Sequence, residues 1–176
     1  ARFYDDEAQI VDMRKGADLI KYIRRIDLSG VHPQLAKVNI QLMSDFSSRL
    51  YGKKSEIMQT YESLDLSQNE AAEIDNLIWY FSELFKNELK IAMGPIERGG
   101  AGGGIAAVLN SLYQAEILTS HELVNQITHL ENLIQQADLI IFGEGLKEED
   151  QILETTTIRI AELTQQYSKP AIAICA

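Results

Sequence analysis

The chain has 176 residues, of which 45% are hydrophobic and 24% charged, and its formal net charge is −10. This size and composition are typical of a globular protein with a hydrophobic core. The acidity argues against binding to nucleic acid or to an anionic membrane, because both would repel the chain. The single cysteine, Cys175, cannot form an internal disulfide, and no apolar run approaches the roughly 20 residues of a membrane span. Together these features favour a cytoplasmic protein.

The first quarter of the chain predicts short elements. Residues 2–5 and 8–12 are expected to form a hairpin, and residues 16–25 a helix with one apolar face. Turn-forming residues dominate 26–35, which predicts a loop, and the alternating pattern of 37–43 predicts a strand.

The strongest helical pattern covers residues 68–90. Ser67, followed three positions later by Glu70, forms a capping box, which is a common start of a helix. Apolar residues then recur at spacings of three and four, as on one face of a helix, at Ile74, Leu77, Ile78, Phe81, Leu84, Phe85 and Leu89. Further helices are expected over 104–115, 120–128, 130–136 and 150–167.

Two apolar segments near the end of the sequence predict a strand–helix–strand unit. "ADLIIFGEG" (137–145) is a continuous apolar run that is typical of a strand buried on both faces, and "KPAIAICA" (169–176) is a second such run. With a helix between them, they predict two parallel strands joined by a right-handed crossover. The expected fold class is therefore α/β, with a mostly parallel sheet flanked by helices.

A glycine-rich stretch precedes the predicted helix 104–115. "GGAGGG" (99–104) places five glycines in six positions. Such a loop can bring bare backbone N–H groups to an anion, and the positive end of the helix dipole would assist it. The same glycines would also suit a flexible connector or a helix packed closely on a sheet, and the Gly-Lys-Ser/Thr of a Walker loop is absent.

Two acidic residues follow predicted strands, where ligands of open α/β sheets commonly bind. Glu144 could hold a metal, accept a proton or orient a substrate hydroxyl, or it could be an ordinary charged loop residue. Asp45 could be a base or a metal ligand, or it could cap a turn. His32, His121 and His129 lack partners at metal-ligand spacing, so the sequence assigns no metal site.

Five segments resemble, in order and spacing, stretches of the bacterial type of glycerate kinase. They are "IDLSGVHPQL", "IQLMSDFSSRLYG", "GGAGGGIAAVL", "ADLIIFGEG" and "YSKPAIAICA". The likeness covers nearly the whole chain, and that family has two α/β domains with an active site in the cleft between them. The resemblance implies that residues 1–176 form a single α/β domain from the middle portion of a larger protein of this kind.

The resemblance also implies a function, namely the phosphorylation of D-glycerate to phosphoglycerate with ATP and Mg²⁺. The partner would be a glycerate-like small acid, and the oligomeric state is left open. The implied catalytic residues are Asp45, Glu144 and Glu148. The implied binding residues for the acid or a phosphate are Gly99, Gly100, Gly102, Gly103, Gly104, Gly143 and Gly145.

The chain departs from the family pattern after Gly145. There "LKEED" stands where the family has Arg-Leu-Asp-x-Gln, so that Glu148 keeps the carboxylate while the arginine and glutamine are absent. A lysine and a proline further along are also absent. Phosphoryl transfer needs cations to neutralise the transferring group. The departures therefore leave an alternative, a catalytically impaired homologue that binds a small acid or phosphorylated metabolite as a regulatory module.

Overall fold

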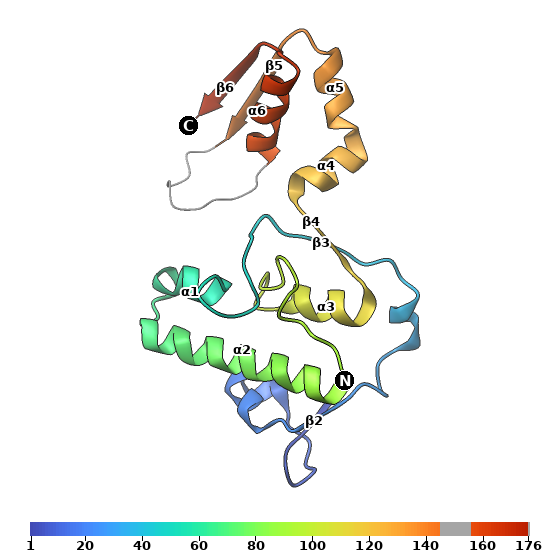
Figure 1. Cartoon of the computed structure of the whole chain (residues 1–176), viewed down its shortest axis with the longest axis vertical. Coiled ribbons are helices and arrows are strands. Elements are labelled where there is room, and N and C mark those ends of the chain that lie inside the picture. The colour runs from blue at the N-terminus through green and yellow to red at the C-terminus, as the bar shows by residue number, and fades with distance from the viewer. Residues whose placement is uncertain (145–155, 176) are drawn as a thin grey trace. The chain divides into compact units, whose positions relative to one another are not determined.

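The structure, a computed structural model, describes residues 1–144 and 156–175 and confirms the α/β class (Figure 1). Among the described residues, the strands form two-stranded sheets. The pairs are β1 (Arg2–Tyr4) with β2 (Arg25–Asp27), β3 (Gln41–Met43) with β4 (Glu116–Leu118), and β5 (Ile140–Glu144) with β6 (Ala171–Cys175). None of the helices in the described ranges is both long enough and apolar enough to cross a membrane.

Contacts within the chain divide it into two compact units. Unit 1 holds residues 1–41 and 48–116, and unit 2 holds residues 42–47 and 117–176. The boundaries fall within or next to β3 and β4, so these two strands carry the chain from one unit to the other. That residues 1–176 act as a single domain of a larger protein stays a prediction.

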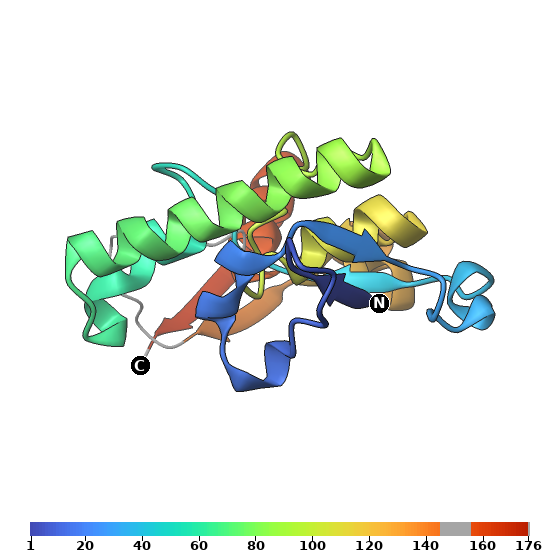
Figure 2. The same cartoon turned by 90° about the horizontal axis from the view of Figure 1, so that it is seen from below.

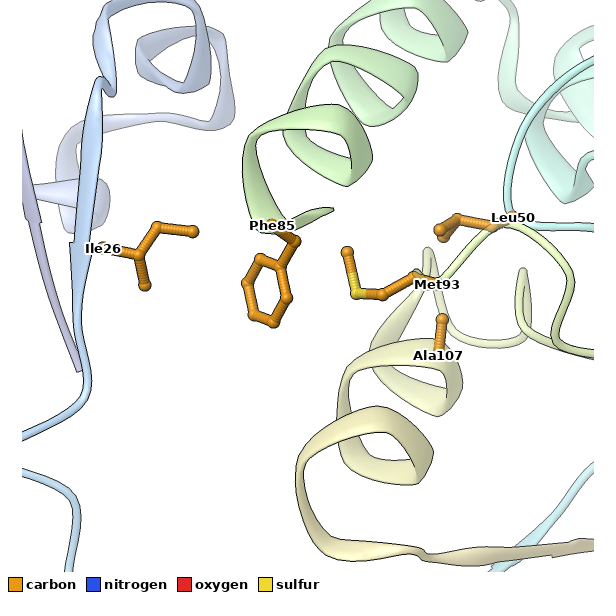
Figure 3. Close-up of a cluster of buried hydrophobic side chains, with 5 residues drawn as sticks. All are labelled: Ile26, Leu50, Phe85, Met93 and Ala107. Carbon is orange, nitrogen blue, oxygen red and sulfur yellow. The ribbon is translucent and has the colours of Figure 1, made fainter. Parts of the chain in front are cut away.

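Helix α2 (Gln68–Leu89) lies in unit 1 and is the longest helix among the described residues. It begins where the capping box predicts. The Ser67 Oγ accepts a hydrogen bond from the Glu70 N–H at 3.3 Å, and the Ser67 N–H donates to the Glu70 carboxylate at 2.8 Å. The apolar face of α2 turns inward, and Phe85 is 2% exposed. Figure 3 shows the buried cluster around it, made of Ile26, Leu50, Phe85, Met93 and Ala107.

Replacing Ser67 with alanine is expected to lower the free energy of unfolding by about 1 kcal/mol, because the cap of α2 is lost. Urea denaturation measures this change, and Ser67→Thr, which keeps a hydroxyl, serves as the control. A loss of equal size in both variants would show that the hydroxyl does not stabilise the helix.

The capping box also predicts a pH dependence. The Ser67 hydroxyl, and next its N–H, hold the pKa of Glu70 below its usual value. A carboxyl whose pKa is lower in the folded state stabilises the fold above its unfolded pKa, and this contribution is lost as pH falls through the folded pKa. The difference between the wild type and Ser67→Ala should therefore shrink in acid, and an NMR titration should find a higher pKa for Glu70 in the variant.

The predicted N-terminal hairpin is present only as a single bridge. Tyr4 and Ile10 form an isolated antiparallel bridge, whereas β1 pairs along its whole length with β2. Phe3 lies opposite Ile26, which is 6% exposed. The two pairings do not compete, because Val11 and Gln9 bond to Phe3 and Asp5 on one edge of β1, while the Arg24 N–H donates to the Tyr4 carbonyl on the other edge.

The predicted helix over residues 16–25 is wrong in type and extent. A 3₁₀ helix covers Ala17–Tyr22, and the chain then extends into β2, where a loop had been predicted. The Tyr80 hydroxyl of α2 donates to the Ile23 carbonyl at 2.6 Å, and Ile23 is fully buried. Both the 3₁₀ helix and β2 contact α2 (Figure 2), so tertiary contacts override the local helical pattern.

The remaining predicted helices correspond to α3 (Ile105–Tyr113), α4 (Ser120–Thr128), α5 (Leu130–Gln136) and α6 (Thr156–Gln166). Helix α1 (Glu56–Thr60) has no counterpart among the predicted elements. The predictions over 104–115, 120–128 and 130–136 are confirmed by α3, α4 and α5. The start of the predicted helix 150–167 lies outside the described residues, and its remainder is α6.

The strand–helix–strand unit is confirmed in unit 2. β5 and β6 pair in parallel, with Ile140 opposite Ala171, and α6 packs against β5. Burial on both faces, however, is wrong, since Ile141, Ile172 and Ile174 are 61%, 50% and 61% exposed. In the described residues this sheet has two strands, and the apolar side chains just named are exposed. Their residue type is nevertheless the one found in parallel strands that are buried on both faces.

Candidate functional site

The glycine-rich loop opens α3, as its sequence predicts. The φ angles of Gly102, Gly103 and Gly104 are 62°, 68° and 100°. These left-handed values strain residues with a Cβ atom, and glycine adopts them freely. The run of glycines therefore sets the backbone path that leads into the helix.

Gly100 has a different role, which is close packing. Its N–H donates to the Ser48 carbonyl at 3.2 Å. A Cβ atom on Gly100 would collide with the Arg49 carbonyl and would lie 2.9 Å from the Ser48 Oγ. Gly99 is also packed, because its Cβ would lie 2.9 Å from the Ile96 carbonyl oxygen. The first part of the loop is thus closely packed, against the backbone of residues 48–49 and Ile96 rather than as a helix on a sheet.

Ser48 brings an unsatisfied hydroxyl to this loop. The residue is 3% exposed, and its Oγ has no hydrogen-bond partner among the described residues. A buried polar group without a partner costs roughly 1–3 kcal/mol. The hydroxyl lies beside Gly100, at the packed part of the loop. Ser48 is not among the site residues predicted from the sequence, although it lies in a segment that resembles the family's strand and loop.

The second part of the loop already binds a carboxylate. The Gly103 N–H donates to the Glu56 Oε2 at 3.2 Å. Gly103 is exposed, and a Cβ on it would meet nothing within 4 Å. Glycine is therefore required at this position for its φ angle, and the Glu56 carboxylate occupies its amide.

Asp75 fixes the segment that carries Glu56. Its carboxylate accepts hydrogen bonds from the Gly52 N–H at 2.8 and 3.0 Å and from the Ser55 hydroxyl at 2.6 Å. Ser55 directly precedes Glu56, the first residue of α1. Asp75 thereby anchors the start of α1 to α2. Nothing in the sequence distinguished it from other polar residues on α2.

Asp45 lies in unit 2, at the start of α4. Its Oδ1 accepts a hydrogen bond from the Ser120 N–H at 2.7 Å. Ser120 is the first residue of α4, so the carboxylate also interacts favourably with the positive end of this helix. The contact matches the capping alternative for Asp45, although the capped element is a helix 75 positions along the chain rather than a local turn.

The remaining predicted site residues lie at or beyond the end of β5. Glu144 is the last residue of β5 and is paired with Cys175. A Cβ on Gly143 would lie 2.9 Å from the Ile174 carbonyl oxygen, so close approach of the two strands explains this glycine. Gly145 and Glu148 lie outside the described residues. In the part of the chain that the structure describes, no three His, Cys, Asp or Glu side chains gather as a metal site would require.

The fold and the loop together define an α/β protein in which a glycine loop precedes a helix and donates a hydrogen bond to a carboxylate. The profile of the glycerate kinase family matches residues 1–176. Glycerate kinase of Halalkalibacterium halodurans is 31% identical over 160 residues, which cover 91% of this chain and 42% of the relative. Glycerate 2-kinase of Escherichia coli is 28% identical over 159 residues, covering 90% and 42%.

A solved structure supports the same relationship. The crystal structure assigned as glycerate kinase 2 from Salmonella typhimurium matches with a TM-score of 0.78 and 25% identity, covering 99% of this chain and 46% of that one. The chain belongs to the glycerate kinase family, as its five segments suggested. It spans somewhat less than half the length of these relatives, with 42% of the first two and 46% of the third.

Proposed function

We propose that this chain supplies the acid-binding part of a kinase that phosphorylates D-glycerate to phosphoglycerate with ATP. The observation that supports it is the glycine loop, in which an exposed N–H of Gly103 already binds a carboxylate. Beside Gly100, in the first part of the loop, the buried Ser48 hydroxyl has no partner among the described residues. Both groups suit the carboxylate or phosphate of a small acid.

The reaction joins a hydroxyl oxygen of glycerate to the γ-phosphorus of ATP while the bond to the bridging oxygen breaks and ADP leaves. The hydroxyl proton must pass to a base, and carboxylates serve this role in many enzymes. Asp45, Glu144 and Glu148 are the proposed carboxylates. Because one oxygen of Asp45 caps α4, its second oxygen is the one left for catalysis.

Mg²⁺ would neutralise charge on the phosphates when it is bound. It usually keeps several waters and takes only one or two protein carboxylates beside substrate phosphates, so a cluster of three is not required. Asp45 and Glu144 have the oxygen chemistry that Mg²⁺ prefers. Gly143 and Gly145, which flank Glu144, are the proposed backbone contacts to substrate or nucleotide at the end of β5.

A second function, binding without turnover, is favoured because the arginine and the lysine that the family has after Gly145 are absent from this chain. Arg49 is a cation near the glycine loop, but its guanidinium donates to the Pro95 carbonyl at 3.1 Å and lies 4.0 Å from the Glu97 carboxylate. A regulatory module that binds a small acid or phosphorylated metabolite would need the glycine loop but not the family's arginine and lysine.

A coupled ADP-release assay with the full-length gene product tests the proposal. We expect ADP release that requires both D-glycerate and ATP and that falls strongly in Asp45→Asn. If glycerate binds in calorimetry while ADP release is absent at millimolar substrate, the binding module is the function. If neither binding nor turnover occurs, both proposals are wrong.

A further inference from the structure

Glu56 reaches the glycine loop from a fixed position. The Ser55 hydroxyl and the Gly52 N–H both donate to Asp75 on α2, which holds the backbone before Glu56 in place. The Glu56 side chain is half-buried, and its carboxylate accepts the hydrogen bond of the Gly103 N–H at 3.2 Å. An incoming anion can take this N–H only if the Glu56 side chain turns away, because α1 itself is anchored.

Two independent features mark the loop as a place for a ligand. The first is that its Gly103 N–H donates to a carboxylate, namely that of Glu56. The second is the Ser48 hydroxyl next to Gly100, which is 3% exposed and lacks a hydrogen-bond partner within the described ranges. Glu56 therefore occupies one donor of the loop, while the Ser48 hydroxyl beside the loop is left without an acceptor.

We propose that Glu56 is a built-in competitor at the glycine loop and sets which anions the loop binds. This inference rests on the proposed function, in which the loop is the acid site. A bound anion must displace the Glu56 carboxylate from Gly103 and remain close to its negative charge. The repulsion is greater for a dianion than for a monoanion, so Glu56 favours a monoanionic carboxylate such as D-glycerate over inorganic phosphate.

The test compares the wild-type full-length gene product with its Glu56→Gln variant, which keeps an acceptor oxygen and removes the charge. Two like charges about 4 Å apart in water weaken binding roughly fivefold, so Glu56→Gln should bind D-glycerate about fivefold more tightly. The gain for inorganic phosphate should be larger at a pH where its dianion predominates. The matched control is Glu73→Gln, which removes one charge from an exposed position on α2 and should bind like the wild type. Calorimetry measures each dissociation constant.

Unchanged or weaker binding in Glu56→Gln, when the wild type binds, would overturn this inference and leave the proposed kinase function intact. If neither anion binds to any variant, the inference is also wrong, and the ADP-release assay decides the function separately. A ligand-free measurement gives a further check, because Glu56→Ala should move the Gly103 amide proton upfield in an NMR spectrum. An unmoved signal would show that Glu56 does not bind this amide, which also overturns the inference.

Discussion

Replacing Phe85 with alanine is expected to lower the free energy of unfolding by about 3–5 kcal/mol. Phe85 is 2% exposed, and its ring centroid lies 5.2 Å from that of Phe81. Truncation would leave a cavity between α2 and the side chains of Met93 and Ile26, and this core cannot close it without moving β2 or α3 (Figure 3). Urea denaturation followed by circular dichroism measures the loss.

The matched control for this variant is Asn76→Ala, on the exposed side of the same helix. It should change the free energy of unfolding by no more than about 0.5 kcal/mol, because it removes no buried contact. A small loss in Phe85→Ala, comparable to that of Asn76→Ala, would mean that the cluster around Phe85 does not stabilise unit 1.

Replacing Gly100 with alanine should also destabilise the fold strongly, by about 1–3 kcal/mol, as is typical of overpacking. The new Cβ would collide with the Arg49 carbonyl, which is backbone and cannot rotate aside as a side chain can. The loop would have to move away from residues 48–49 and lose the hydrogen bond from the Gly100 N–H to the Ser48 carbonyl. Urea denaturation again provides the measurement.

Gly30 offers the control for this substitution, because a Cβ there would meet nothing within 4 Å and its φ lies outside the left-handed range. Gly30→Ala should leave the free energy of unfolding within about 0.5 kcal/mol of the wild type. Equal stability of Gly100→Ala and Gly30→Ala would contradict the close packing of the loop on residues 48–49.

The sequence predicted the elements whose signals are local. α2 begins at its capping box and follows its apolar period, since both depend on residues within a few positions of one another. The N-terminal region differs because β1 and β2 pair across a gap of some 20 residues, and no local pattern specifies such a partner. Strand propensity depends on this context more than helix propensity does.

The candidate site was predictable only in part, for the same reason. The glycine loop is visible in the sequence, and the left-handed φ of Gly103 explains its composition. The contact from Glu56 to Gly103 spans 47 positions, and the one from Asp75 to Ser55 spans 20, so each depends on the fold. A buried hydroxyl without a partner, such as that of Ser48, becomes visible only when its surroundings are known.

A crystal structure of the full-length gene product with D-glycerate would test the central claim most directly, namely that the glycine loop holds the acid. We expect the glycerate carboxylate within about 3 Å of the Gly103 nitrogen, with the Glu56 side chain turned away. Glycerate bound elsewhere, with the Gly103 amide still on Glu56, would contradict the claim.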